Sequence, residues 1–448
     1  MFNFFIRITS HFLPVKISID IYYLRLYDIQ ARLGKQTRKK VSYVSMERKK
    51  KMTVLMINMF IAIASFGIII PILPAYLESI GEGGTAAGLM IAIFAGAQLV
   101  MSPVAGKWAD QYGRRLMIIL GLAGLAISMF MFYLFDSIWW LYASRVIGGI
   151  GAALLVPAIF AYVADITSLE ERAKGNSFVS AAMSLGIVVG PGIGGFLADF
   201  GLKVPLLASA LLSVVAVLFS IAVLKESKDL GGETISLEQE EPMVTKLFQS
   251  VRKPYFIPLV IVLVMSFGLM AYESVLGLYV DNQFGATPQE IAVMITATGV
   301  ISVIVQLFIV ERIVSRFGEA MVLSMFLAVT TAGFLFSLFA SSYALFFCIT
   351  LIIFLATSIL RPVLTTLISK LAGEEQGFAM GMNNAYMSIG NVLGPTLAGV
   401  LYDVEITYPF LLGLVVLGVT VLVSIMWQQK QGKKLRKMKI DPLQPGSH

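Results

Sequence analysis

Apolar residues fill long runs along this chain, and short polar segments separate the runs. Residues 204–224 and 408–427 contain no acidic or basic side chain, and each matches the roughly 20 residues with which a helix crosses a hydrocarbon core. Ten further runs have comparable length: 53–77, 86–106, 116–135, 138–163, 175–200, 255–280, 288–310, 320–340, 343–371 and 377–402. The pattern predicts an all-α membrane protein with twelve spanning helices.

The composition supports this assignment. Hydrophobic residues make up 57% of the 448 residues and charged residues only 14%, whereas soluble domains carry about 25% charged residues. One cysteine, Cys348, excludes an intramolecular disulfide and any cysteine metal site. The two histidines stand at the chain ends, which excludes histidine-based catalysis in the body of the chain. We therefore expect no cofactor, no metal and no enzymatic activity.

Charge alternates between successive connecting segments. Lysine and arginine cluster at 48–51, 107–115, 172–174, 246–253, 312–316 and 430–439, whereas the intervening loops hold Glu78, Glu82, Asp136, Asp281, Glu290 and Glu405. By the positive-inside rule both termini are cytoplasmic. Such short, separated clusters do not form the continuous basic face that nucleic acid requires.

Two six-span halves are predicted on either side of one long polar segment. Residues 228–254 form the expected cytoplasmic linker between halves at 52–227 and 255–428, and 429–448 form a basic tail. Residues 181–199 align without gaps on residues 385–403, sharing Met-Ser, Gly-Pro, a later Gly and a final Asp. Halves related by internal duplication, with a site at their interface, are a recurring plan of transporters.

The first 51 residues differ from the rest, because they mix apolar and basic residues without a continuous span. Either an interfacial amphipathic segment or an upstream start codon chosen in error explains them. Met46 and Met52 stand just before the first span, and we favour the second explanation.

The strongest local motif is the segment 106–115 between the second and third spans. Gly106 and Gly113 allow tight turning, and Asp110 and Arg114 lie four residues apart, so they can pair. The segment resembles the G-x-x-x-D-x-x-G-R-[RK] signature of the major facilitator superfamily. The resemblance implies that Asp165 completes a charge cluster that latches the two halves together on the cytoplasmic side. Residues 311–318 form a degenerate second copy.

Two further motifs resemble the same superfamily. Arg145 opens a fourth-span motif, and an arginine within a span is normally functional or paired, although it can also extend to the membrane interface. The fifth span carries a motif associated with proton-coupled exporters, although close helix packing explains its glycines equally well. Its residues are Gly186, Gly190, Pro191, Gly194 and Gly195.

Glu273 is the candidate coupling acid, because it stands within the seventh span with no other acid nearby. Desolvation disfavours the charged form of a carboxyl group, which brings its proton uptake into the physiological range. A misplaced span boundary would instead make it interfacial. The chain resembles the NorA-like multidrug pumps of Gram-positive bacteria, which implies proton coupling through Glu273, Arg145 and Arg361. These pumps carry an acid where this chain has Ser358.

Several polar and aromatic side chains are candidates for substrate binding. Gln98 is an amide within the second span, and Ser358 can form hydrogen bonds but cannot ionise. Phe94, Tyr272 and Tyr386 are able to stack on flat drugs, although aromatic residues in spans more often serve packing.

The resemblance implies a monomeric plasma-membrane antiporter that exports amphipathic, often cationic drugs in exchange for protons. Two alternatives stay open: export of one specific metabolite, such as a sugar or amino acid, and a sensor that transports nothing. No ATP-binding loop motif occurs in the sequence, which argues against ATP-driven export.

Overall fold

The computed structural model describes residues 46–227, 243–373 and 375–440, and every regular element in them is a helix. The extension 1–45 and most of the predicted linker lie outside the described residues. Residues from Leu55 onward form one unit, and the contacts below lie within it. The first helix is Met46–Ile69; the others are α2 (Leu73–Ser79), α3 (Gly84–Tyr112), α4 (Arg114–Leu134), α5 (Ile138–Ile166), α6 (Leu169–Ala198), α7 (Val204–Val223), α8 (Met243–Ser250), α9 (Phe256–Phe284), α10 (Pro288–Phe308), α11 (Val310–Phe317), α12 (Glu319–Ser337), α13 (Tyr343–Ala372), α14 (Gln376–Val404) and α15 (Tyr408–Ile440).

Eleven of the described helices are long and apolar enough to cross a membrane. The remaining predicted span, 377–402, is also a helix of 29 residues, α14. It falls short in hydropathy because its first half carries Asn383, Asn384 and Gln376 and its second half carries Asn391. The all-α membrane architecture is confirmed.

One predicted span is wrong in detail. We expected a single helix over 53–77, but the first helix ends at Ile69 and α2 begins at Leu73. Pro71 has no backbone N–H and cannot continue a helical hydrogen-bond ladder, while Pro74 is favoured in the first turn of α2. The intervening residues form turn hydrogen bonds, from Ile70 to Gly67 and from Ile72 to Ile69.

The internal duplication is visible in the backbone. Gly113, between α3 and α4, has φ 97° and ψ 153°, and Gly318, between α11 and α12, has φ 76° and ψ 154°. Only glycine adopts these angles without strain. Both glycines therefore stand at the same turn of the two halves.

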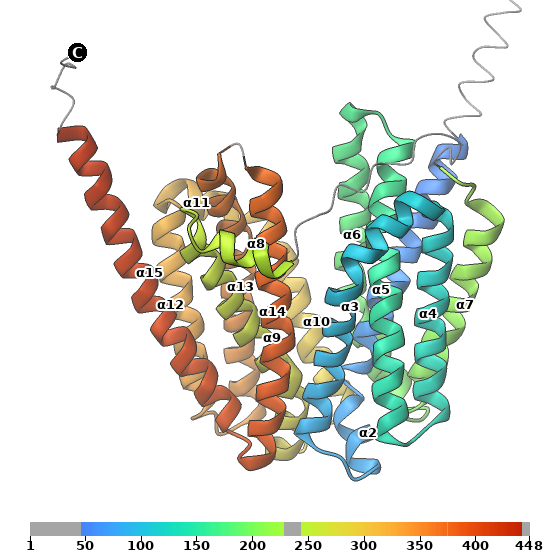
Figure 1. Cartoon of the computed structure of the whole chain (residues 1–448). Helices are drawn as coiled ribbons and strands as arrows, with labels where there is room; N and C mark the ends of the chain where they lie inside the picture. The colour runs from blue at the N-terminus through green and yellow to red at the C-terminus, as the bar shows by residue number, and fades with distance from the viewer. Residues whose placement is uncertain (1–45, 228–242, 374, 441–448) are drawn as a thin grey trace, which may run out of the picture. The chain divides into compact units, whose positions relative to one another are not determined.

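Two six-helix bundles result. The first comprises residues 55–69 of the first helix and α3 to α7, and the second comprises α9, α10 and α12 to α15. Contacts of α3 with α14 and of α6 with α10 join the bundles. We call the helix ends near Gly113, Gly318, α8 and α11 the basic end, and the opposite ends, near α2, the acidic end (Figure 1).

Candidate functional site

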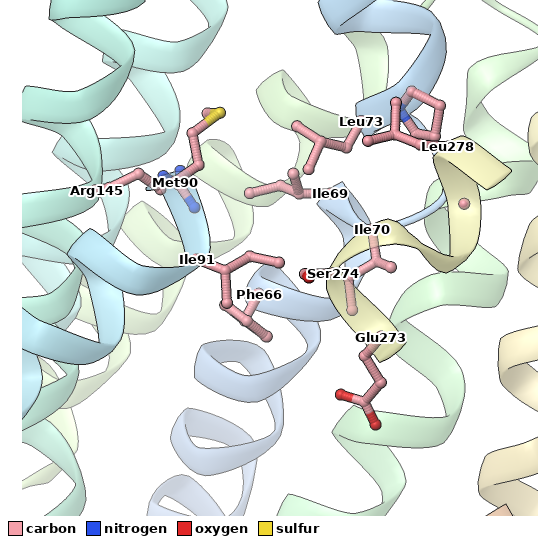
Figure 2. A pocket seen from close by; sticks show the side chains of 12 residues that line it. Phe66, Ile69, Ile70, Leu73, Met90, Ile91, Arg145, Glu273, Ser274 and Leu278 are labelled. Atoms are coloured by element: carbon pink, nitrogen blue, oxygen red, sulfur yellow. The ribbon is translucent and has the colours of Figure 1, made fainter. Parts of the chain in front are cut away.

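A small pocket lies between the two bundles, on the side of the acidic end (Figure 2). Its volume of about 30 Å³ has room for roughly one or two water molecules but not for a drug-sized ligand. Residues from the first helix, α2, α3, α5 and α9 line it: Phe66, Ile69, Ile70, Leu73, Pro74, Met90, Ile91, Arg145, Glu273, Ser274, Gly277 and Leu278. The pocket thus brings two predicted residues, Arg145 and Glu273, to one apolar site.

Glu273 is half-buried in the middle of α9. In the described part of the chain, its carboxylate has neither a hydrogen bond nor an ion pair, and the Arg361 guanidinium acts on it electrostatically from beyond ion-pair distance. Figure 2 shows the carboxylate pointing away from the apolar side chains of Leu73 and Leu278. The group is therefore available to a proton or to a charged ligand.

Arg145 is buried, with 3% of its surface exposed. Its guanidinium donates to Ser128 Oγ at 3.4 Å and lies 4.9 Å from the centre of the Phe132 ring, while its Nε has no partner. No carboxylate from the described residues pairs with it. Burial against α4 excludes the interfacial alternative, and Ser128 and Phe132 are contacts that the sequence analysis missed.

Arg361 and Ser358 lie one turn apart on α13 but in different surroundings. Arg361 is exposed although it stands in the middle of a membrane helix, a placement that normally requires an aqueous cavity rather than lipid. Ser358 is buried, and its hydroxyl donates to the Leu355 carbonyl at 2.8 Å.

The candidate substrate residues divide into two groups. Phe94 and Gln98 are partly exposed on α3, and the Phe94 ring lies 5.1 Å from that of Phe66 in the pocket wall. Tyr272 is buried in an aromatic cluster, with its hydroxyl 2.7 Å from Thr350 Oγ1. Tyr386 is buried beside α8, with its hydroxyl 2.9 Å from Ser250 Oγ. The two tyrosines thus lie in the core of the second bundle and do not line the pocket.

The predicted charge cluster is assembled at the basic end. Arg114 lies 2.6 Å from Asp110 Oδ1 and 3.5 Å from Asp165 Oδ2, and Gly106 and Gly113 flank it. Sequence reasoning missed Glu226, which accepts from the backbone N–H groups of Arg114 at 2.9 Å and Arg115 at 3.2 Å.

Glu226 has a structural explanation. The residue at the helix start, Gly113, has no side chain to cap α4. A carboxylate from the segment after α7 therefore satisfies the free N–H groups of α4. Ser227 then donates to Asp165 at 2.7 Å, which ties the segment after α7 to the cluster.

The fifth-span glycines serve close packing. Cβ atoms at Gly186 and Gly190 would lie within 3.0 Å of the first helix, and a Cβ at Gly194 would overlap the Ile68 carbonyl. Pro191 packs against Gly67, whereas Gly195 faces Ala292 and Pro288 of α10 in the other bundle. The motif therefore binds α6 to both halves.

Comparisons with known proteins identify the family. The model of the Major Facilitator Superfamily matches residues 55–282 and 259–445. The chain is 39% identical over 387 residues to Multidrug resistance protein 2 of Bacillus subtilis (strain 168), covering 86% of this chain and 97% of that protein. It is 32% identical over 385 residues to Quinolone resistance protein NorA of Staphylococcus aureus, covering 86% and 98%.

A solved structure agrees with the fold. The bacterial homologue of the human lysosomal transporter Spinster, in an inward-facing and occupied conformation, superposes with a TM-score of 0.70 at 14% identity, covering 84% of this chain and 96% of that one. The chain belongs to the major facilitator superfamily of membrane transporters.

Proposed function

We propose that this chain exports chemically diverse amphipathic drugs, many of them cationic, from the cytoplasm in exchange for protons. The relatives named for multidrug and quinolone resistance support the substrate class. The single observation that carries the coupling is Glu273, a carboxylate that lines a pocket between the two bundles and has no ion-pair partner among the described residues.

The orientation of the chain in the membrane follows from charge. The basic end lies in the cytoplasm under the positive-inside rule, and both termini are therefore cytoplasmic and the acidic end is external. The protein works as a monomer in the plasma membrane, with halves at 52–227 and 255–428 joined by the linker 228–254.

Glu273 carries the proton in this proposal. When the site opens to the cytoplasm, the carboxyl group releases its proton and binds a cationic drug; when the site opens outward, protonation displaces the drug. A proton and a cation then compete for one group, which makes transport an exchange. The Arg361 guanidinium, which acts electrostatically on Glu273, opposes binding of a second cation.

The drug occupies a wider space than the pocket. The pocket holds no drug-sized ligand, so the substrate site extends from Glu273 in the direction in which its carboxylate points. Phe94 and Gln98 contribute an aromatic face and an amide to it. Because Ser358 replaces the second acid and its hydroxyl is engaged with the backbone, one carboxylate serves both proton and drug.

Ethidium transport into inside-out membrane vesicles, whose cytoplasmic face is outward, tests this proposal. We expect energised vesicles to accumulate ethidium, an uncoupler to abolish the accumulation, and chemically unrelated cationic drugs to compete. Competition by a single compound class would identify a specific metabolite exporter instead. Absence of uncoupler-sensitive transport for every compound would contradict the proposal.

A further inference from the structure

Helices α3 and α14 come from opposite bundles, pack against each other in opposite directions and carry the same residues at the same spacing. Each begins with a Gly-x-x-x-Gly pair and ends with a Gly-x-x-x-Asp pair at equal separations. In α3 the residues are Gly84, Gly88, Gly106 and Asp110; in α14 they are Gly377, Gly381, Gly399 and Asp403. The start of each helix therefore faces the end of the other.

At the acidic end this arrangement forms a contact between the bundles. Asp403, at the end of α14, accepts hydrogen bonds from the backbone N–H groups of Gly84 at 2.6 Å and Thr85 at 2.8 Å. The residue at the start of α3, Gly83, offers no side-chain cap of its own. The first turn of α3 is thus capped by a carboxylate of the other half, which combines a charge-assisted hydrogen bond with the favourable helix dipole.

The glycines make this contact possible. A Cβ at Gly88 would overlap the Pro395 carbonyl, a Cβ at Gly399 would overlap the Gly84 carbonyl, and a Cβ at Gly84 would lie 2.6 Å from the Tyr402 ring. Backbones approach this closely only where small residues face each other.

At the basic end the corresponding residues of α3 and α14 make no such contact with each other. Cβ atoms built on Gly106, Gly377 and Gly381 would meet no atom within 4 Å. Asp110 pairs with Arg114 of its own bundle. The start of α14 has no side-chain cap, since the Glu375 carboxylate binds Lys253 at 2.7 Å.

We propose that Asp403 is the latch that holds the acidic end closed. In the present state Asp403 caps α3. In the opposite state Asp403 leaves the start of α3 and the acidic end opens, while the glycines of the basic end, Gly106, Gly377 and Gly381, come into contact.

Interspin distances in nanodiscs, measured without substrate or proton gradient, test this inference independently of the export proposal. The background variant is Cys348→Ser, and the spin labels are placed at Trp139→Cys and Ser341→Cys. Both positions are exposed at the acidic end, Trp139 at the start of α5 and Ser341 just before α13. The distance between the labels reports opening of that end. We expect Asp403→Asn to increase the population with the longer distance about tenfold relative to the closed one, as lost charge-assisted hydrogen bonds imply. Glu405→Gln, which removes a nearby exposed acid that caps nothing in the other bundle, should leave the distribution unchanged.

A matched pair of glycine variants covers the case in which the aspartate variant is unstable. Gly88→Ala and Gly381→Ala make the same chemical change at equivalent positions of the two helices. Gly88→Ala should open the acidic end, whereas Gly381→Ala, which has space in the present state, should hold that end closed. An unchanged distribution in Asp403→Asn, or shifts of the two alanine variants in the same direction, would overturn the inference.

Discussion

Lys370 Nζ lies 2.5 Å from Glu319 Oε1, and these two residues occupy in the second bundle the places that Arg114 and Asp165 occupy in the first. Each pair is separated by 51 residues, and its first member follows a glycine with positive φ. The charges are exchanged between the two positions. The residue after the glycine is the cation in the first bundle and the acid in the second. The degenerate copy of the sequence motif therefore keeps an ion pair at this turn with its polarity reversed.

Charge reversal at this pair tests whether it acts as a unit. Glu319→Lys places two cations together and should lower the free energy of unfolding by about 0.5–1 kcal/mol, because Lys370 is exposed and water screens the pair. Glu319→Lys with Lys370→Glu should restore stability. Thermal unfolding in detergent measures both, and a double variant no more stable than the single one would show that the pair contributes nothing.

Removing the Glu226 carboxylate tests the cap on α4. Glu226→Ala leaves the N–H groups of Arg114 and Arg115 without their acceptor and should lower stability by about 1 kcal/mol. Glu405→Ala is the control, since it removes an exposed acid that caps no other helix. Equal stability of the two variants in thermal unfolding would contradict the capping role.

Replacing Arg145 separates function from stability. Arg145→Met removes a buried charge that has no carboxylate partner in the described residues, so stability should stay equal or rise. Ethidium efflux should nevertheless fall at least about tenfold, as expected for a functional charge within a span. Arg145→Lys, which keeps the charge but loses the flat contact with Phe132, serves as the comparison. Ethidium efflux at the wild-type rate in Arg145→Met would contradict a role of Arg145 in transport.

Alanine at two neighbouring glycines tests the packing role of the fifth-span motif. Gly194→Ala would overlap the Ile68 backbone and should destabilise the protein by about 1–3 kcal/mol. At Gly192 a Cβ would meet only Thr296 Oγ1, at 3.2 Å, and Gly192→Ala should be milder. Thermal unfolding measures both variants. If their midpoint temperatures are equal, the close approach of α6 to the first helix does not explain why position 194 is glycine.

The sequence predicted the features that depend on short separations. Apolar runs located the spans, and the four-residue spacing of Asp110 and Arg114 predicted their ion pair. Pro71 marks the break in the sequence, but the isoleucines on both sides continue the apolar run, so hydropathy alone predicts one span there. The proline ends the helix even though the surrounding residues are apolar.

The sequence does not predict contacts that depend on which face of a helix meets which neighbour. Glu226 lies 112 residues from its partner Arg114, so no local pattern connects them. Spans that are apolar on every side give no signal of orientation, so the sequence does not show which neighbours Tyr272 and Tyr386 face. The structure places their hydroxyls against Thr350 and Ser250 inside the second bundle.

The most direct test of the account is uncoupler-sensitive ethidium efflux in energised inside-out vesicles that carry Glu273→Gln. The amide keeps the shape of the side chain but cannot exchange a proton, so we predict that gradient-driven efflux is lost while the protein stays folded in the membrane. Glu405→Gln, the same substitution at an exposed helix end, should transport like the wild type. Wild-type, uncoupler-sensitive efflux by Glu273→Gln would contradict the account, because the coupling proton would then travel through another group.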